Sequence, residues 1–148
     1  LIGLMNEQQE KVNNAARHTE ESRYSQRTMA DLRDNLAGTK KIYEIFQPFL
    51  KTKSNATDKG TDVDTAIEGG FQHLSDVYAT ISGDAFPAPP DTWDAEATTH
   101  TVAELATPFG TLYSEVLAQV DITKPGSIVD EMNRAATLMG LMPFTQEP

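Results

Sequence analysis

Apolar residues recur three and four positions apart along five successive segments of this chain, and this spacing constrains the fold more than any other feature. In an α-helix such residues fall on one face, whereas a strand needs an apolar and polar alternation that no segment sustains. The segments run from Leu1 to about Arg17, from about Thr28 to Phe49, from Thr61 or Asp62 to about Ile81, over residues 102–120, and from Ile128 to Met139. These stripes predict an all-α helical bundle of four to five helices.

One connection is much longer than the others. Residues 82–100 hold three of the prolines and Trp93, the only tryptophan. Loops of this length in compact domains usually cover a surface or carry a function. An exposed Trp93 beside a groove would favour a binding role for the loop, whereas a buried Trp93 would favour a structural one. Pro108 interrupts the spacing of residues 102–120, where we expect a kink or a late helix start.

Length and charge limit the classes of protein to which this chain can belong. The 148 residues carry a net charge of −10, with a sequence pI near 4.6. Nucleic-acid surfaces need clustered Lys and Arg, so we expect no nucleic-acid partner. The apolar runs are far too short for a transmembrane segment. The sequence holds no cysteine, which excludes disulfides and thiolate metal sites. A single domain over residues 1–148 is expected at this size.

The start of the chain is already apolar. Residues 1–5 read Leu-Ile-Gly-Leu-Met, which is typical of the interior of an amphipathic helix. We therefore expect the chain to be a processed or truncated piece of a longer protein, and its sequence does not say whether the piece arises naturally.

The second segment carries a line that mixes polar and apolar residues. At spacings of three and four, the line consists of Asp31, Asn35, Gly38, Ile42, Ile45 and Phe49. We expect this line to be buried, with Asp31 and Asn35 hydrogen-bonded. Together with Arg23, Tyr24 and Ser25 just upstream, they form a candidate polar cluster around a helix N-terminus. The cluster is either a structural junction, with Gly38 allowing close approach of another backbone, or a site that contacts a ligand.

Two pairs of residues have a spacing that suits a shared metal ion. His18 and Glu21 are three residues apart, and so are His73 and Asp76. An imidazole and a carboxylate at this spacing on a helix can bind one metal. The alternatives are a solvated polar helix end for the first pair and a hydrogen-bonded histidine at the rim of the bundle for the second.

Several short motifs resemble imelysin-like proteins. The motifs are Arg23-Tyr24-Ser25 through Gly38 with Ile42-Tyr43 and Pro48, Gly70-Phe71, the loop Pro87-Ala88-Pro89-Pro90-Asp91-Thr92-Trp93, Thr107-Pro108-Phe109-Gly110, and Asn133-Arg134-Ala135-Ala136. The chain resembles the C-terminal half of this family from about Glu21 onward. The family includes imelysin, which is classed as a metallopeptidase, and iron-uptake lipoproteins.

The resemblance implies an all-α fold of two related bundles, located in the periplasm or at the bacterial cell surface. The metal motif of the family, G-x-H-x-x-E, is absent. His18 and Glu21 follow Ala16 where the motif has glycine, and His73 has Asp76 in place of glutamate and a different glycine spacing. We therefore do not assign the metal site of the family to this chain. The resemblance carries over only the polar cluster, which would face a cleft between the two halves.

These observations predict a component of iron or other metal acquisition. The chain would be the C-terminal bundle that lines or supports a binding cleft, with the N-terminal bundle, or its cleaved fragment, and a metal ion or metal complex as partners. Iron or zinc would be held mainly by the N-terminal half. A metallopeptidase is the enzymatic alternative, although no open metal position or general base is evident. A polysaccharide-binding or partner-binding helical module is the other alternative function.

Overall fold

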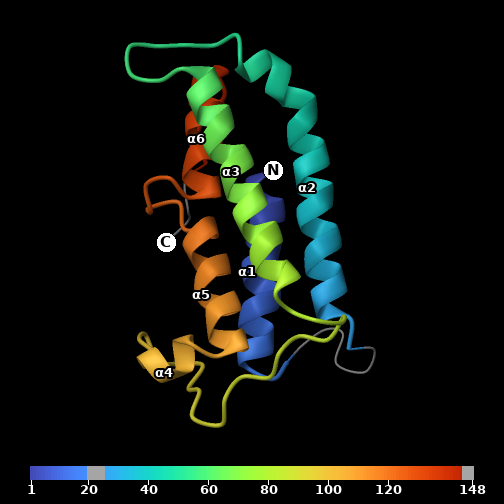
Figure 1. The fold of residues 1–148 in the computed structure, drawn as a ribbon. Helices are drawn as coiled ribbons and strands as arrows, with labels where there is room; N and C mark the ends of the chain where they lie inside the picture. Colours follow the sequence, from blue (N-terminus) through green and yellow to red (C-terminus); the bar gives the residue numbers. More distant parts are fainter. Residues whose placement is uncertain (20–25, 145–148) are drawn as a thin grey trace.

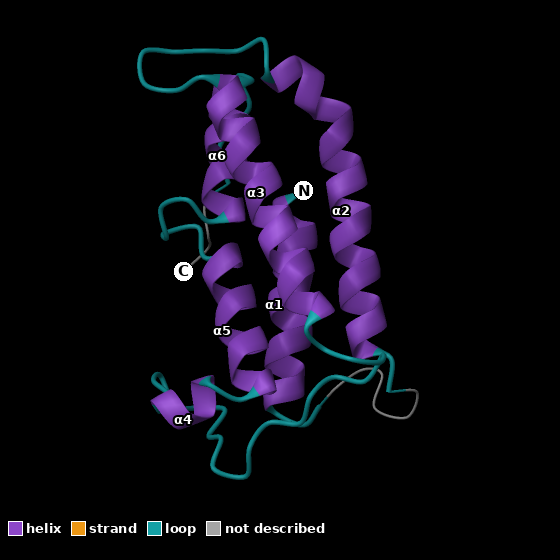
Figure 2. Cartoon of the chain, viewed as in Figure 1, coloured by secondary structure: helices purple, strands orange, loops and turns teal. Residues whose placement is uncertain are grey.

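A computed structural model describes residues 1–19 and 26–144 as a bundle of helices (Figures 1 and 2). Within these residues no strand occurs, which confirms the predicted all-α class. The helices are α1 (Ile2–Ala16), α2 (Thr28–Leu50), α3 (Gly60–Ala79), α4 (Val102–Leu105), α5 (Pro108–Val120) and α6 (Ile128–Leu138).

The helices form four columns. Helices α1, α2 and α3 are three of them, and α5 and α6 are stacked end to end as the fourth (Figure 1). Helix α1 contacts α2 and α5, while α3 contacts α2, α5 and α6. With 15 residues against 23, α1 is shorter than α2 by about 12 Å at 1.5 Å per residue. Its N-terminus lies partway up α2, so the last turns of α2 extend beyond α1 (Figure 1).

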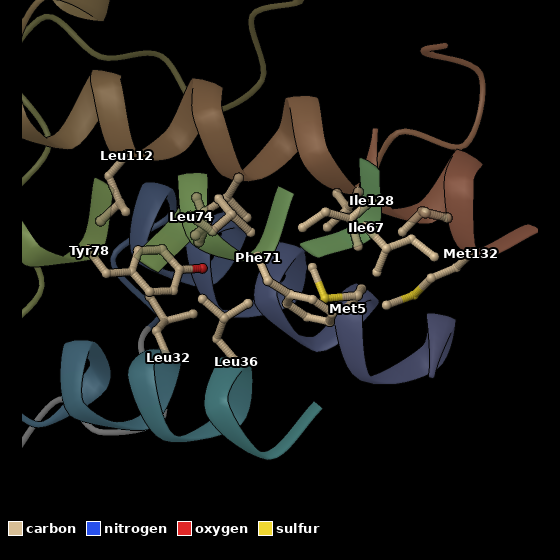
Figure 3. Packing of buried hydrophobic residues seen from close by; sticks show 14 of the residues in the cluster. Met5, Leu32, Leu36, Ile67, Phe71, Leu74, Tyr78, Leu112, Ile128 and Met132 are labelled. Carbon is tan, nitrogen blue, oxygen red and sulfur yellow. The ribbon is translucent and has the colours of Figure 1, made fainter. Parts of the chain in front are cut away.

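The predicted apolar rows form the core between these columns (Figure 3). The fully buried residues of α3 are Val63, Ile67, Phe71, Leu74 and Tyr78. The row of α2 that begins at Met29 and Leu32 is also buried, except for Phe46, which is 44% exposed. Thr39 lies within that row and is buried as well. The row tolerates this polar side chain because its hydroxyl donates a hydrogen bond of 2.8 Å to the carbonyl of Asn35.

The second line of α2 is not buried, and the expectation that it is core was wrong. Ile42, Ile45 and Phe49 are 42%, 73% and 51% exposed. Asp31 and Asn35 are half-buried. A helix at the edge of a bundle turns one face inward, and here the row that starts at Met29 takes that position. The apolar residues of the other line are consequently left substantially exposed.

No other backbone approaches Gly38, contrary to the interpretation of the polar cluster as a structural junction. It is exposed in the middle of α2, and a Cβ built there has nothing within 4 Å. Gly38→Ala should therefore raise the free energy of unfolding by about 0.5–1 kcal/mol, since alanine loses less backbone entropy in a helix. Denaturant titration of the two proteins measures this difference, and a loss of stability would show that Gly38 has a neighbour.

Residues 102–120 form two helices, so residues 1–19 and 26–144 contain six helices where four to five were predicted. Thr107 caps α5 by accepting a 3.0 Å hydrogen bond from the amide of Gly110, and Pro108 is the first helical residue. Proline is well tolerated at that position because its missing N–H would have no partner within the helix. Pro108 therefore starts a helix and does not kink one.

The long loop of residues 82–100 packs against the lower end of α5. Phe86 is 8% exposed and lies edge-on to Phe109, with ring centroids 5.8 Å apart. Trp93 is partly buried, stacks on His100 at 3.6 Å and meets the rings of Phe109 and Tyr113. Trp93 thus acts as a packing residue of the loop, as the structural alternative predicted.

Candidate functional site

The first predicted metal pair lies at the end of α1. His18 is exposed and has a φ of 56°, directly after the last turn of the helix. The amide of Thr19 donates to the carbonyl of Asn14 at 2.9 Å, which closes the helix as in a Schellman motif. His18 therefore occupies the left-handed position that usually favours glycine. Its partner Glu21 lies outside the described residues.

The two residues of the second predicted metal pair, His73 and Asp76, each interact with a different residue. His73 is exposed on α3, and its Nε2 lies 2.7 Å from the Oε2 of Glu115 on α5. Asp76 instead accepts a 2.8 Å hydrogen bond from Gln72. His73 thus has the hydrogen-bonded rim position of the structural alternative. In residues 1–19 and 26–144, no group of three or more His, Cys, Asp or Glu side chains is arranged to hold a metal ion.

The predicted polar cluster is only partly described. Arg23, Tyr24 and Ser25 lie outside the described residues. Asp31 belongs to the first turn of α2, where a negative charge interacts favourably with the helix dipole. Asn35 contributes its backbone carbonyl to Thr39.

A polar network centred on the buried Asp64 joins the C-terminal half of α2 to α3. Asp64 of α3 is 4% exposed, and the hydroxyl of Tyr43 donates a 2.6 Å hydrogen bond to its Oδ1. The Nζ of Lys51 lies 3.0 Å from the Oδ2 of Asp64. One turn along α3, Glu68 pairs with Lys40 at 2.7 Å and accepts a hydrogen bond from Gln47. The network fixes the rotation of α2 about its axis and thereby the face that it exposes.

The electrostatics of this network favour a charged Asp64. Burial acts to raise the pKa of the Asp64 carboxyl, but hydrogen bonds from Tyr43, Lys51 and Gln47 outweigh it and hold the pKa below its ordinary value. The pKa of Tyr43 is raised, first by burial and then by the hydrogen bond to Asp64. Tyr43 therefore stays a neutral hydrogen-bond donor to a carboxylate.

Arg134 ties α6 to the loop that joins α2 and α3. Its guanidinium pairs with Asp58 of the loop and lies 2.5 Å from the Oε1 of Glu131. Glu131 is 4% exposed, and burial raises the pKa of its carboxyl. Because Asp58 is in the connection between α2 and α3, this pair holds the upper end of α6 in place beside them.

An apolar groove lies between α2 and α6. It has a volume of about 720 Å³. Its walls are Ile42 and Phe46 of α2, Met132 and Ala136 of α6, Met139 directly after that helix, the first three residues of the chain, and residues 141–144. Asn133 holds the last of these segments, since its side chain exchanges two hydrogen bonds with the backbone of Phe144.

The groove continues into the exposed apolar line of α2. Ile45 and Phe49 extend the apolar surface along the outer side of that helix. This surface was not predicted, although one signal was present in the sequence. The stretch from Ile42 to Leu50 is apolar on more than one side, which is typical of a helix packed on two sides.

The fold and the groove define an all-α helical bundle with an open apolar surface at one end. The family model of imelysin matches residues 1–107, which is most of the 148-residue chain. The chain therefore belongs to the imelysin family, as its motifs predicted. The match extends from α1 through α4 and ends just before α5. No curated protein and no solved structure matches the chain.

No helix in the part of the chain that the structure describes combines the length and apolar character needed to cross a membrane.

Proposed function

We propose that this chain is the C-terminal bundle of an extracytoplasmic imelysin-like protein that takes part in the acquisition of iron or another metal. The bundle packs against a companion bundle, the N-terminal half of the protein or its cleaved fragment, and supports a binding cleft between the two. Membership of the imelysin family supports the class. The observation that supports a companion bundle is the exposed apolar side of α2, because such surfaces on folded proteins usually mark interfaces.

In this proposal the metal is bound mainly by the companion. The polar groups of this chain position neighbouring residues and do not bind the metal directly. Asp64, Glu68 and Glu131 already pair with Lys51, Lys40 and Arg134. The catalytic alternative, a metallopeptidase, rests on family membership alone.

Isothermal titration of the metal-stripped chain with Fe(III), Fe(II) and Zn(II) tests this assignment. The expected result is no tight one-to-one binding by this chain alone. Tight binding that is lost in His18→Ala or His73→Ala would contradict the supporting role and give the chain a metal site of its own.

The physiological part of the proposal needs a second experiment. Source cells that lack the gene should grow more slowly under iron chelation, and a plasmid copy should restore growth. Cell fractionation should find the protein outside the cytoplasm. Unchanged growth under iron, zinc and manganese limitation would contradict a role in metal acquisition.

A further inference from the structure

We propose that the stack of His100 on Trp93 is a pH-sensitive fastening of the loop of residues 82–100, which holds the loop more firmly to α4 and α5 when His100 carries a proton. Figure 1 shows α4 and the start of α5 at the lower end of the bundle. The inference goes beyond the proposed function, because it involves neither a metal nor a companion bundle.

The geometry of the rings is the first argument. The centroids of the imidazole of His100 and the indole of Trp93 lie 3.6 Å apart, and the two ring planes are inclined by only 12°. Tyr113 of α5 meets His100 edge-on at 5.7 Å. A cation over the face of an indole is attracted by its π electrons, and the attraction grows as the site is removed from water. His100 is half-buried, so its protonated ring gains a contact that the neutral ring lacks.

The charges around His100 are the second argument. Residues 82–100 contain four acidic residues and neither lysine nor arginine, so His100 is the one residue of the loop that can become a cation. Glu104 of α4 is buried. Hydrogen bonds, first that from the backbone amide of Thr101, hold the pKa of the Glu104 carboxyl below its ordinary value, and the positive charge of His100 adds to this effect. Glu104 is therefore a carboxylate that attracts the imidazolium.

Tyr113 and Arg17 also face the stack. Burial raises the pKa of the Tyr113 hydroxyl, so Tyr113 is neutral where histidines titrate. Arg17, directly after α1, acts electrostatically on Tyr113, and its positive charge disfavours a second cation nearby. Glu96 of the loop offsets that charge, since its Oε1 lies 3.1 Å from the Nε of Arg17. The surroundings as a whole therefore favour a protonated His100.

The stack joins three elements, so its strength affects how the loop is held. Trp93 lies in the middle of the loop and contacts the rings of Phe109 and Tyr113 on α5. His100 directly precedes Thr101, the N-cap of α4. By linkage, the contribution of the imidazolium to the packed loop is complete at acidic pH and is lost as the pH rises through the titration of His100.

Fluorescence provides the first test. Trp93 is the only tryptophan of the chain, so its emission reports on this stack alone. A protonated imidazole in contact with an indole quenches the emission, because it accepts an electron from the excited ring far more readily than a neutral imidazole does. The emission should fall as the pH is lowered from about 8 to about 5, a range in which histidine is the side chain that ordinarily changes charge.

Hydrogen exchange measures the fastening itself. The amides of Trp93 and Ala97 donate to the carbonyls of Pro90 and Asp94 within the loop. Their protection factors, which are corrected for the intrinsic effect of pH on exchange, should rise about fivefold over the same fall in pH, as expected for one cation–π contact at a partly exposed site.

Variants of the three histidines assign the response. His100→Phe keeps a ring at the position next to Trp93 but takes up no proton, and His100→Gln is a second variant in case the larger ring disturbs folding. Both should lose the fluorescence response and the rise in protection. His73→Gln is the matched control, because it removes an exposed histidine on α3 and should keep both responses.

Four results would overturn the inference. They are a constant emission of the unmodified chain over this pH range, the same fall in emission in both His100 variants, a response that disappears in His73→Gln, and protection factors that stay constant or fall at acidic pH. The measurements use the chain without metal, so their failure would leave the proposed role in metal acquisition standing.

Discussion

Gly110→Ala is expected to lower the free energy of unfolding by about 3 kcal/mol, because a side chain at this position collides with backbone. A Cβ built on Gly110 would lie 2.0 Å from the carbonyl oxygen of Glu104 and 2.6 Å from the Cα of Leu105. Backbone cannot rotate away as the end of a long side chain can, so α4 would have to separate from α5.

Thermal unfolding followed by circular dichroism measures this effect. For a chain of this size, the loss corresponds to a melting temperature lower by about 6–12 °C. Separation of α4 from α5 should also weaken the cap at Thr107, whose hydroxyl donates to the carbonyl of Glu104 at 2.7 Å. Gly38→Ala is the matched control, since it adds the same methyl group to a helix with nothing within 4 Å. Equal effects of the two substitutions would contradict the close contact.

Asp64→Ala is expected to destabilise the protein by about 2–3 kcal/mol at pH 7. The substitution leaves the buried hydroxyl of Tyr43 without its acceptor and removes the partner of Lys51. Because Lys51 is about half exposed, its ammonium regains water, and the larger cost comes from Tyr43. Asp76→Ala, which removes an exposed acid from the same helix, should cost less than about 0.5 kcal/mol.

The effect of Asp64 should also depend on pH in a defined direction. Its pKa in the folded protein is lower than in the unfolded chain, where it is about 3.9. Its stabilising contribution is therefore complete above that value and is lost as the pH falls through the folded pKa. Denaturant titrations at decreasing pH should show the difference between the two proteins shrink in this acidic range. A difference that stays constant down to pH 2 would contradict a charged Asp64.

The sequence was most informative where a local pattern fixes a local structure. The ends of α1, α2, α3 and α6 lie within one or two residues of their predicted positions. Ser127 caps α6 by accepting from the amide of Asp130, and Gly140 follows that helix with a φ of 77°, and these are the positions that serine and glycine commonly take at helix ends. Pro108 was correctly placed as an interruption, but only the cap at Thr107 shows that it starts α5.

The candidate sites were less predictable because they depend on residues distant in sequence. His73 pairs with Glu115, which is 42 residues away, and not with Asp76 on its own helix. Gln8 is fully buried within an otherwise apolar row because Tyr78, 70 residues away, donates a hydrogen bond to its side chain. Neither partner can be inferred from the periodicity of one helix.

Sequence patterns alone were enough to predict an all-α bundle of the imelysin family, with most of its helix ends and core rows. Periodicity, caps and prolines act within a few residues, so they can be interpreted without the rest of the molecule. Which apolar line of α2 faces the core became clear only from the packing of the helices. That choice depends on how α2 packs against α1 and α3 and on the polar network between α2 and α3, and it leaves Ile42 and Phe46 at the open groove.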